Sequence, residues 1–227
     1  MNRRLEAIAS LVREGRGLID VGTDHGCLPV YLAQRGYTGL LCASDINAAP
    51  LEAARRTARE ASLEERIRFL LCDGLDECPR ELIDTIVIAG MGGDLICRIL
   101  DRAEWTLDGA YTLILQPMTK AEVLRYWLAN NGFLLEEERI VRDGGRLYQI
   151  IRARYEKNMP LSDAELFSGA FENIRGEALC REFLEGLIRR FEKEERGLLA
   201  AEKAEPGRLA ICRGILRGLL EMKGKLP

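Results

Sequence analysis

The sequence predicts an α/β fold, in which a mostly parallel sheet covered by helices on both faces is followed by an α-helical hairpin. Short apolar runs alternate with helical patterns up to about residue 155, as expected for a parallel sheet. Two strand-like runs close this part of the chain, and no strand pattern appears after residue 162. We therefore expect two domains, residues 1–157 and residues 158–227, the second being the helical hairpin.

The alternation begins with a helix over residues 3–14, where apolar residues recur at helical spacing until Gly15. Residues 18–21 are apolar and end in glycine, which predicts a strand and a tight turn. Pro29 stands near the first turn of the helix that follows, where proline is favoured. Further strands are expected over residues 40–44, 67–71, 85–89 and 111–115, and further helices over residues 28–35, 50–61, 94–103 and 120–130.

The first domain is expected to end in two strands, residues 134–141 and 147–154, separated by only five residues. A connection between parallel strands needs about a dozen residues or more, so this pair must form an antiparallel β-hairpin. The predicted sheet is therefore parallel except at this end.

The segment after residue 162 combines many charges with regularly spaced apolar residues, a pattern typical of amphipathic helices. A turn at Glu205-Pro206-Gly207 divides it into two helices. The expected apolar faces comprise Phe183, Leu187, Phe191 and Leu198 in the first helix and Leu209, Cys212, Leu216, Leu219 and Met222 in the second. We expect these helices to form a hairpin resembling a short antiparallel coiled coil.

The composition is that of a folded globular protein, with 47% apolar and 30% charged residues. A formal net charge of −3 provides no overall basic field, so a nucleic acid would have to be bound by local clusters. The candidate basic residues are Arg3, Arg4, Arg13 and Arg16 in the first helix region and Arg189, Arg190, Lys193, Arg208, Arg213 and Arg217 in the helical hairpin. Interspersed glutamates leave a solvated charged face as the alternative interpretation.

The chain start, Met1–Glu6, lacks the apolar region of a signal peptide, and no apolar stretch is long enough to span a membrane. A cytoplasmic protein without a membrane partner is expected. The seven cysteines form no CxxC pair, their number is odd, and His25 is the only histidine. This composition favours reduced thiols and no metal site.

The strongest candidate for a binding site is the run Asp20-Val21-Gly22-Thr23-Asp24-His25-Gly26 after the first predicted strand. Gly22 and Gly26 allow the backbone to approach a ligand where a doubly wound sheet opens its crevice. Asp24 would repel a pyrophosphate, and the GxGxxG spacing of dinucleotide sites is absent, whereas the cationic groups of S-adenosylmethionine suit acidic residues. The alternatives are a plain turn, with Asp24 as a helix cap and His25 structural.

Two further acids follow the next two predicted strands. Asp45 lies 19 residues beyond Gly26, about where an acid accepts hydrogen bonds from ribose hydroxyls. Asp73, with Gly74, is placed to contact an adenine amino group. The alternatives are a helix N-cap for Asp45 and a simple turn for Asp73. Three acids at successive strand ends together favour an adenosyl ligand.

A fourth motif, Ile88-Ala89-Gly90-Met91-Gly92-Gly93, leaves the strand that neighbours the reacting methyl group in methyltransferases. Its glycines suggest close backbone approach to a cofactor or base, with Met91 as an apolar contact; the alternative is a flexible start of a helix. Gln116 and Pro117 end the next predicted strand and are expected to line the target pocket, unless they only terminate that strand.

Together these motifs resemble the bacterial tRNA (adenine-22, N1)-methyltransferases. The resemblance rests on residues 20–29, 44–47, 72–75, 88–93 and 115–117 and covers the chain to about residue 155. It implies a Rossmann-like methyltransferase sheet, in which one strand near the edge is reversed, S-adenosyl-L-methionine as cofactor and tRNA as partner. The expected cofactor-binding residues are Asp20, Gly22, Gly26, Asp45, Ile46, Asp73, Gly74, Gly90 and Met91. Asp24, His25 and Gln116 are the catalytic candidates.

The implied reaction is methyl transfer to N1 of adenine 22 in the D-arm region of tRNA. N1 lies on the Watson–Crick edge, so a paired adenine must be opened before it reacts. Attack leaves positive charge on the base, which the Asp24 carboxylate is placed to stabilise. The alternative functions are a small-molecule methyltransferase and a non-catalytic adenosyl-binding interaction protein; the missing GxGxxG disfavours a dehydrogenase.

Overall fold

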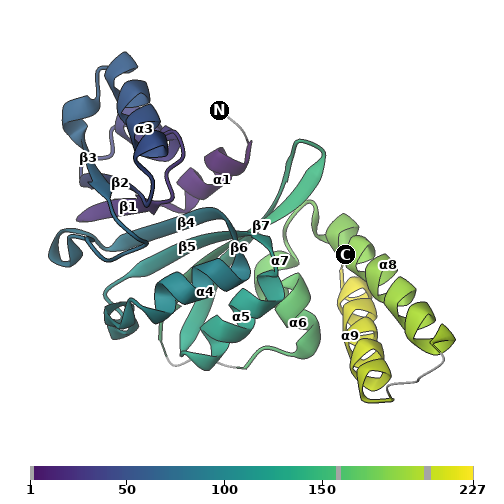
Figure 1. Cartoon of the computed structure of the whole chain (residues 1–227). Helices are drawn as coiled ribbons and strands as arrows, with labels where there is room; N and C mark the ends of the chain where they lie inside the picture. Colours follow the sequence, from purple (N-terminus) through teal and green to yellow (C-terminus); the bar gives the residue numbers. More distant parts are fainter. Residues whose placement is uncertain (1–2, 157–159, 202–205, 227) are drawn as a thin grey trace.

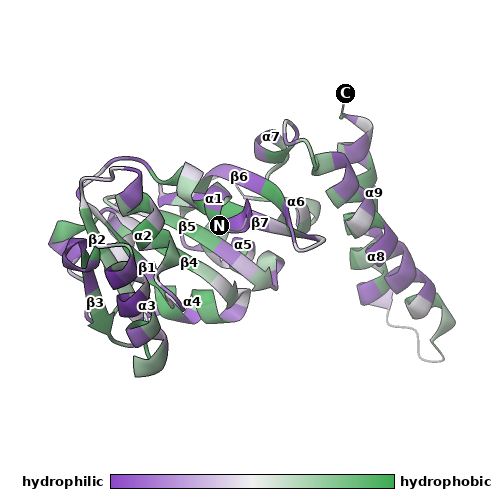
Figure 2. Cartoon of the chain, turned by 90° about the horizontal axis from the view of Figure 1, so that it is seen from above, coloured by the Kyte–Doolittle hydropathy of each residue, from purple (hydrophilic) through white to green (hydrophobic). Residues whose placement is uncertain are grey.

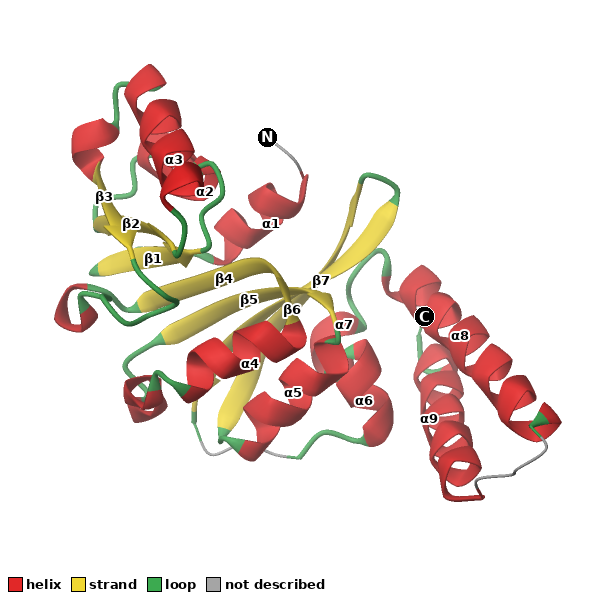
Figure 3. Cartoon of the chain, in the orientation of Figure 1, coloured by secondary structure: helices red, strands yellow, loops and turns green. Residues whose placement is uncertain are grey.

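The computed structural model describes residues 3–156, 160–201 and 206–226 and contains a seven-stranded sheet of order β3-β2-β1-β4-β5-β7-β6. The strands are β1 (Gly17–Val21), β2 (Leu40–Asp45), β3 (Ile67–Leu71), β4 (Thr85–Gly92), β5 (Thr112–Thr119), β6 (Phe133–Asp143) and β7 (Arg146–Tyr155). β7 is antiparallel to both β5 and β6, and β1 to β5 are parallel (Figure 3). The expected α/β fold with one reversed strand near its edge is confirmed.

Helices cover both faces of this sheet (Figure 1). One face carries α1 (Arg3–Leu11), α2 (Cys27–Gln34) and α3 (Ala48–Glu60), and the other carries α4 (Gly93–Asp101) and α5 (Ala121–Asn130). A hydrophobic core lies on each face of the sheet, and successive β1 side chains point into them alternately. Leu18 packs in the core under α1 and α2, and Ile19 packs in the core under α4 and α5. Both side chains are fully buried, as in a sheet covered on both faces.

The sequence placed the ends of β4 and β5 too early. β4 continues to Gly92 and β5 to Thr119, because pairing resumes beyond Ala89↔Gln116 as Met91↔Pro117 and Gly92↔Thr119, with irregular register. Such bulges are frequent beside active sites, and one of them here accommodates a proline within a strand. The alternative that Gln116 and Pro117 merely terminate a strand is therefore wrong.

Beyond β7 the described chain is helical, with α6 (Asp163–Ser168), α7 (Phe171–Ile174), α8 (Cys180–Ala200) and α9 (Pro206–Gly224). α8 and α9 form the expected helical hairpin, which stands to one side of the α/β unit (Figures 1 and 2). Residues 158 and 159 at the predicted domain boundary and Glu205 of the predicted turn lie outside the described residues. A short β6–β7 turn, as expected, precedes this helical part.

The buried residues of the helical hairpin agree only in part with the predicted ones: Phe191, Cys212, Leu219 and Met222 are confirmed. α8 buries Cys180, Leu184, Ile188 and Phe191 against Cys212, Ile215, Leu219 and Met222 of α9. The predicted residues Phe183 and Leu187 are only partly buried, because two i, i+4 apolar rows run side by side on α8. This leaves the second row facing the α/β unit.

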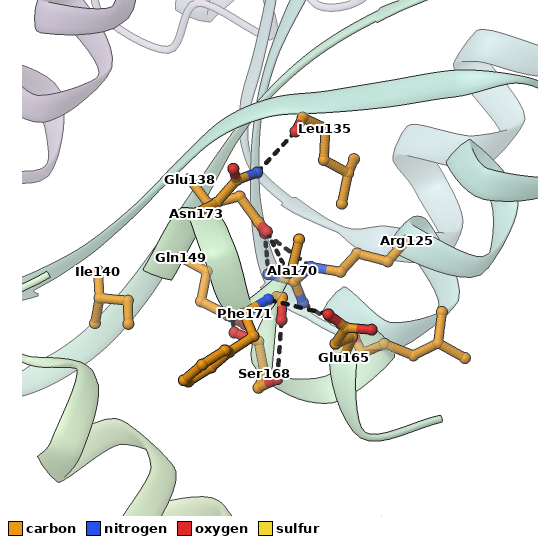
Figure 4. Close-up of polar contacts among 12 residues, drawn as sticks. Arg125, Leu135, Glu138, Ile140, Gln149, Glu165, Ser168, Ala170, Phe171 and Asn173 are labelled. Carbon is orange, nitrogen blue, oxygen red and sulfur yellow. Dashed lines mark hydrogen bonds and ion pairs between the residues drawn. The ribbon is translucent and has the colours of Figure 1, made fainter. Parts of the chain in front are cut away.

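Polar contacts of buried groups fix α6 and α7 to the sheet (Figure 4). Arg125 of α5 donates to Glu138 of β6 through Nε and Nη2, at 2.9 and 2.7 Å, and both side chains are fully buried. Arg125 also donates to the Leu166 carbonyl oxygen (3.0 Å), and the second Glu138 oxygen accepts from the Ala170 amide (2.7 Å). This one ion pair therefore holds the α6–α7 segment at two residues, Leu166 and Ala170.

The cysteines are all free, as expected, and six of the seven are buried. Cys27 at the start of α2 is the exposed one. Among the described residues, no helix combines the length and apolar character needed to cross a membrane.

Candidate active site

A cavity of about 590 Å³ opens where the carboxyl ends of β1 and β4 meet. It is enclosed by α1, the β1–α2 loop, the end of β4 and Met118 of β5. This point is the topological switch of the sheet, since β1 leads to β2 on one side and pairs with β4 on the other. Of the expected site residues, the cavity brings together Asp20, Gly22, Asp24, His25 and Gly90.

Asp20 is the buried acid of this cavity. Its position on β1 directs it to the same sheet face as Leu18, and it is only 8% exposed. The Thr23 hydroxyl donates a hydrogen bond to Asp20 Oδ2 at 2.6 Å. Burial raises the pKa of Asp20 to about 7, and the Thr23 bond opposes that rise. Within the described residues no cation pairs with this carboxyl group, so a cationic ligand would be stabilised beside it.

Asp24 and His25 lie at the mouth of the cavity, with side chains 81% and 60% exposed. His25 Nε2 is 3.5 Å from Asp24 Oδ2. Helix α2 begins after Gly26 without any side-chain cap, so the alternative that Asp24 caps this helix is wrong. Gly22 and Gly26 both have left-handed φ angles, 72° and 64°, which explains the two glycines of the turn.

Gln116 lies behind the cavity wall. Its side chain is fully buried, and its Oε1 accepts from the Gly90 amide and from Arg4 Nη1, both at 3.2 Å. Its Nε2 donates to the Pro117 carbonyl oxygen at 2.8 Å. Gln116 thus joins α1, β4 and β5, and its polar atoms are satisfied within the protein. The sequence did not reveal this link, because Arg4 is 112 residues away.

Gly92 at the end of β4 and Gly93 at the start of α4 pack against the end of β5. A Cβ on Gly93 would lie 2.2 Å from the Lys120 carbonyl oxygen, and one on Gly92 would lie 3.3 Å from Thr119 Oγ1. The Met91 side chain lies against the β1–α2 loop, since a Cβ on Gly22 would lie 2.2 Å from its methyl group. Close approach to Thr119 and Lys120 therefore explains Gly92 and Gly93. A Cβ on Gly90 would meet nothing within 4 Å, and its left-handed φ of 80° is what favours glycine there.

Asp45, Ile46, Asp73 and Gly74 lie at the ends of β2 and β3, beside the cavity rather than in its lining. Asp45 accepts from the Asn47 amide at 2.8 Å, and Asn47 itself is the N-cap of α3, so the N-cap alternative for Asp45 is wrong. Ile46 is 61% exposed next to it. Asp45 is paired in register with Leu71, whose side chain is 58% exposed.

Exposed apolar side chains at adjacent strand ends suit a flat aromatic ligand. Asp73 is held by an ion pair with Arg102, which also pairs with Asp76. Arg102 is a partner that the sequence did not indicate, because it comes from the turn after α4.

A cavity with two acids and no phosphate-binding loop favours a cationic nucleoside over a dinucleotide. Its place at the switch point of a sheet with β7 reversed defines the protein as a Rossmann-like methyltransferase. The "Methyltransferase domain" sequence family matches residues 1–151.

Individual relatives narrow this class. The Bacillus subtilis tRNA (adenine(22)-N(1))-methyltransferase is 33% identical over 153 residues, 67% of this chain and 64% of its own length. The crystal structure of the B. subtilis m1A22 tRNA methyltransferase TrmK has a TM-score of 0.86 at 26% identity, covering 98% of both chains. The crystal structure of Streptococcus pneumoniae Sp1610, named as a tRNA (m1A22) methyltransferase and in complex with S-adenosyl-L-methionine, has a TM-score of 0.77 at 31% identity, covering 97% of this chain and 98% of its own. The chain belongs to the TrmK family of tRNA (adenine-22, N1)-methyltransferases.

Proposed function

We propose that this protein transfers a methyl group from S-adenosylmethionine to N1 of adenine 22 in tRNA. The observation that carries the proposal is the pair of acids, Asp20 and Asp24, in one cavity at the β1–β4 switch point. The names of the B. subtilis and S. pneumoniae relatives support the cofactor and the substrate. The sequence alignment covers less than two thirds of the B. subtilis enzyme, so the tRNA specificity is part of the proposal.

The residues present fit this cofactor. Asp20, without a cationic partner among the described residues, is placed for the methionine end, and Gly22 leaves room for its backbone. Asp45 is the candidate acceptor for the ribose hydroxyls, and Ile46 with Leu71 offers an apolar surface for the adenine. When bound, the cofactor supplies an electrophilic methyl group.

Asp73, Gly74, Gly26 and Met91 complete the proposed set of cofactor residues. Asp73 would have to share its carboxylate between Arg102 and an adenine amino group. Gly26 acts indirectly, because a Cβ there would lie 2.9 Å from Ala54 of α3 and displace the loop. Met91 touches Gly22 and would have to move or pack against the ligand.

The protein's own groups act on the target mainly through position and charge. Asp24 lines the cavity, and among the described residues its carboxylate contacts only His25, so it is available to stabilise the cation that forms on adenine. His25 is placed to contact the base or the cofactor. Gln116 is a positioning residue, since it holds the Gly90 amide and Arg4 in place.

Cofactor affinity is expected to depend on pH through Asp20. In the free protein its pKa is about 7, and a bound cation would lower that pKa, so binding below neutral pH must release a proton. The Kd of S-adenosylmethionine is therefore expected to fall as pH rises, by up to about tenfold per unit, and to level off above about pH 7. Calorimetry in buffers of different ionisation enthalpy measures both the Kd and the released proton.

The Asp20→Asn variant should bind more weakly above neutral pH and lose this pH dependence. His25→Gln is the matched control, because it removes the neighbouring imidazole. This variant should keep the pH dependence of the Kd. A wild-type Kd that stays constant across this range would contradict the assigned role of Asp20.

We further propose that the chain works as two parts, a methyltransferase domain of residues 1–157 and a helical part of residues 158–227 that contributes to tRNA binding. The basic side chains of α8 and α9 support this role in tRNA binding. Two of them are less available for phosphate contacts, because Arg213 is paired with Glu195 and Lys223 with Glu185. A tRNA substrate implies that the enzyme acts in the cytoplasm.

The direct test is incubation of the full chain with methyl-labelled S-adenosylmethionine and unmodified bulk tRNA. We expect the label to enter the tRNA, from which treatment with ribonuclease should release it. Label in a small molecule without RNA would favour a small-molecule methyltransferase. Cofactor binding without transfer to any tRNA would favour a non-catalytic interaction protein.

A further inference from the structure

A second cavity, of about 250 Å³, lies between the α/β unit and α8. Its walls come from the end of β5, the start of β7 and one face of α8. Met118 lines both this cavity and the one that holds Asp20 and Asp24. The two cavities are therefore neighbours, and a chain leaving the first would pass Met118 into the second.

The charged residues that line this second cavity, called the groove below, are mainly cationic. Lys120, Arg146 and Arg190 contribute to it, and Glu122 is the single acid among its lining residues. Lys120 is paired with Asp94, whereas Arg146 is exposed and has no ion pair within the described parts of the chain. An anion would thus meet a net positive charge, and two of the three cations, Arg146 and Arg190, have no ion pair among the described residues.

The floor of the groove is apolar and aromatic. Phe183 and Leu187 are the half-buried second row of α8, and Phe167 of α6 lies beside them. The guanidinium of Arg190 lies against the Phe167 ring, 5.6 Å from its centroid, and is held over this floor. Cations above an apolar surface are the features that bind a nucleotide, the phosphate by charge and the base by stacking.

The wall between the two cavities is also fixed. Tyr148 lines the groove, and Arg4, which lines the first cavity, lies over its ring with 5.3 Å to the centroid. Arg4 in turn donates to Gln116. The spacing between the groove and the reacting centre is therefore set by contacts among α1, β5 and β7.

We propose that this groove binds a nucleotide that flanks the target adenine, with its phosphate on Arg146 and Arg190 and its base on the floor formed by Phe183 and Leu187. The inference rests on the proposed RNA methylation and specifies the path of the RNA strand. Because the target must leave its stack to react, its neighbour needs a separate site, and the groove supplies one next to Met118. The β6–β7 hairpin, which carries Arg146, thus has a role in substrate binding.

The test is a charge reversal at Arg146 in the full chain, with Arg154→Glu as the matched control. Arg154 is also exposed and lies on β7, about 26 Å away at the other end of the strand. Binding of an unmodified tRNA transcript is measured by fluorescence anisotropy over a salt series, and binding of S-adenosylhomocysteine by calorimetry. Methyl transfer gives kcat and KM.

Arg146→Glu is expected to raise the Kd and KM for tRNA at least about tenfold and to reduce the slope of log Kd against log salt by about one. The Kd of S-adenosylhomocysteine, the melting temperature and kcat at saturating tRNA should stay at the wild-type values. Arg190→Gln tests the wall of the groove that α8 forms, and this variant should also raise the Kd for tRNA.

Wild-type tRNA affinity and salt slope in Arg146→Glu, or equal losses in Arg154→Glu, would overturn the groove assignment while leaving tRNA methylation intact. If the wild-type protein methylates no tRNA, the proposed function itself fails. If Arg146→Glu instead weakens capture of a protein partner without changing tRNA binding, the groove is a protein-binding site and the inference is wrong.

Discussion

Asp24→Asn is expected to lower kcat for methyl transfer by about 10²- to 10³-fold, the usual effect of removing one preorganised charge from a transition state. The physical reason is the position of the carboxylate. It lies at the mouth of the cavity, caps no helix and contacts only His25 in the described structure, so no structural role accounts for it. Single-turnover methylation of unmodified tRNA at saturating cofactor measures the chemical step.

Cofactor binding should be nearly unchanged by Asp24→Asn. S-adenosylhomocysteine lacks the sulfonium charge, and its Kd is expected to change by less than about threefold. Glu60→Gln, which neutralises an exposed acid at the end of α3, is the charge-matched control and should keep wild-type kcat. Undiminished turnover in Asp24→Asn would remove this residue from the mechanism.

Glu138→Gln is expected to destabilise the protein by about 3–5 kcal/mol, because it leaves the fully buried Arg125 guanidinium without a counter-charge. The same substitution weakens the acceptor for the Ala170 amide, which holds the α6–α7 segment on β6 (Figure 4). Denaturant unfolding followed by circular dichroism measures the free energy of unfolding.

Removing both charges provides the decisive comparison. Arg125→Met/Glu138→Gln lacks the unpaired buried cation and should be more stable than Glu138→Gln alone, although the Leu166 carbonyl loses its donor. Glu64→Gln, at the surface Arg59–Glu64 pair, should lower the free energy of unfolding far less than Glu138→Gln does. A double variant no more stable than the single one would show that the ion pair is not the source of the loss.

The fold was predictable from local patterns. The alternation of apolar runs and helical patterns identified the parallel strands, and the five-residue connection after residue 141 required an antiparallel pair. The ends of β4 and β5 were not predictable, because glycine and proline normally interrupt strands. Here an irregular register carries Met91 and Pro117 through the sheet.

The candidate site was predictable where topology alone places residues. Asp20 and Gly90 lie near the ends of β1 and β4, Asp24 follows β1, and all three line the cavity where these strands meet at the switch point. Contacts from distant side chains were not predictable. Arg102 engages Asp73, and Arg4 reaches Gln116, and in both cases the partner lies outside the local pattern.

The same limit applies to the helical part. Two rows of apolar residues on α8 satisfy the helical period, and only packing against α9 decides that Leu184 and Ile188 form the core. The row with Phe183 and Leu187 is thereby left for the groove beside β7.

The central claim is tested most directly by mapping the methyl group on tRNA treated with the protein and S-adenosylmethionine. A methyl group on N1 blocks the Watson–Crick edge, so reverse transcription should stop at adenine 22, and nucleoside mass spectrometry should detect 1-methyladenosine. A transcript with guanine at that position should show neither signal. Methylation of another base, or of adenine at a position other than 22, would contradict the proposed specificity.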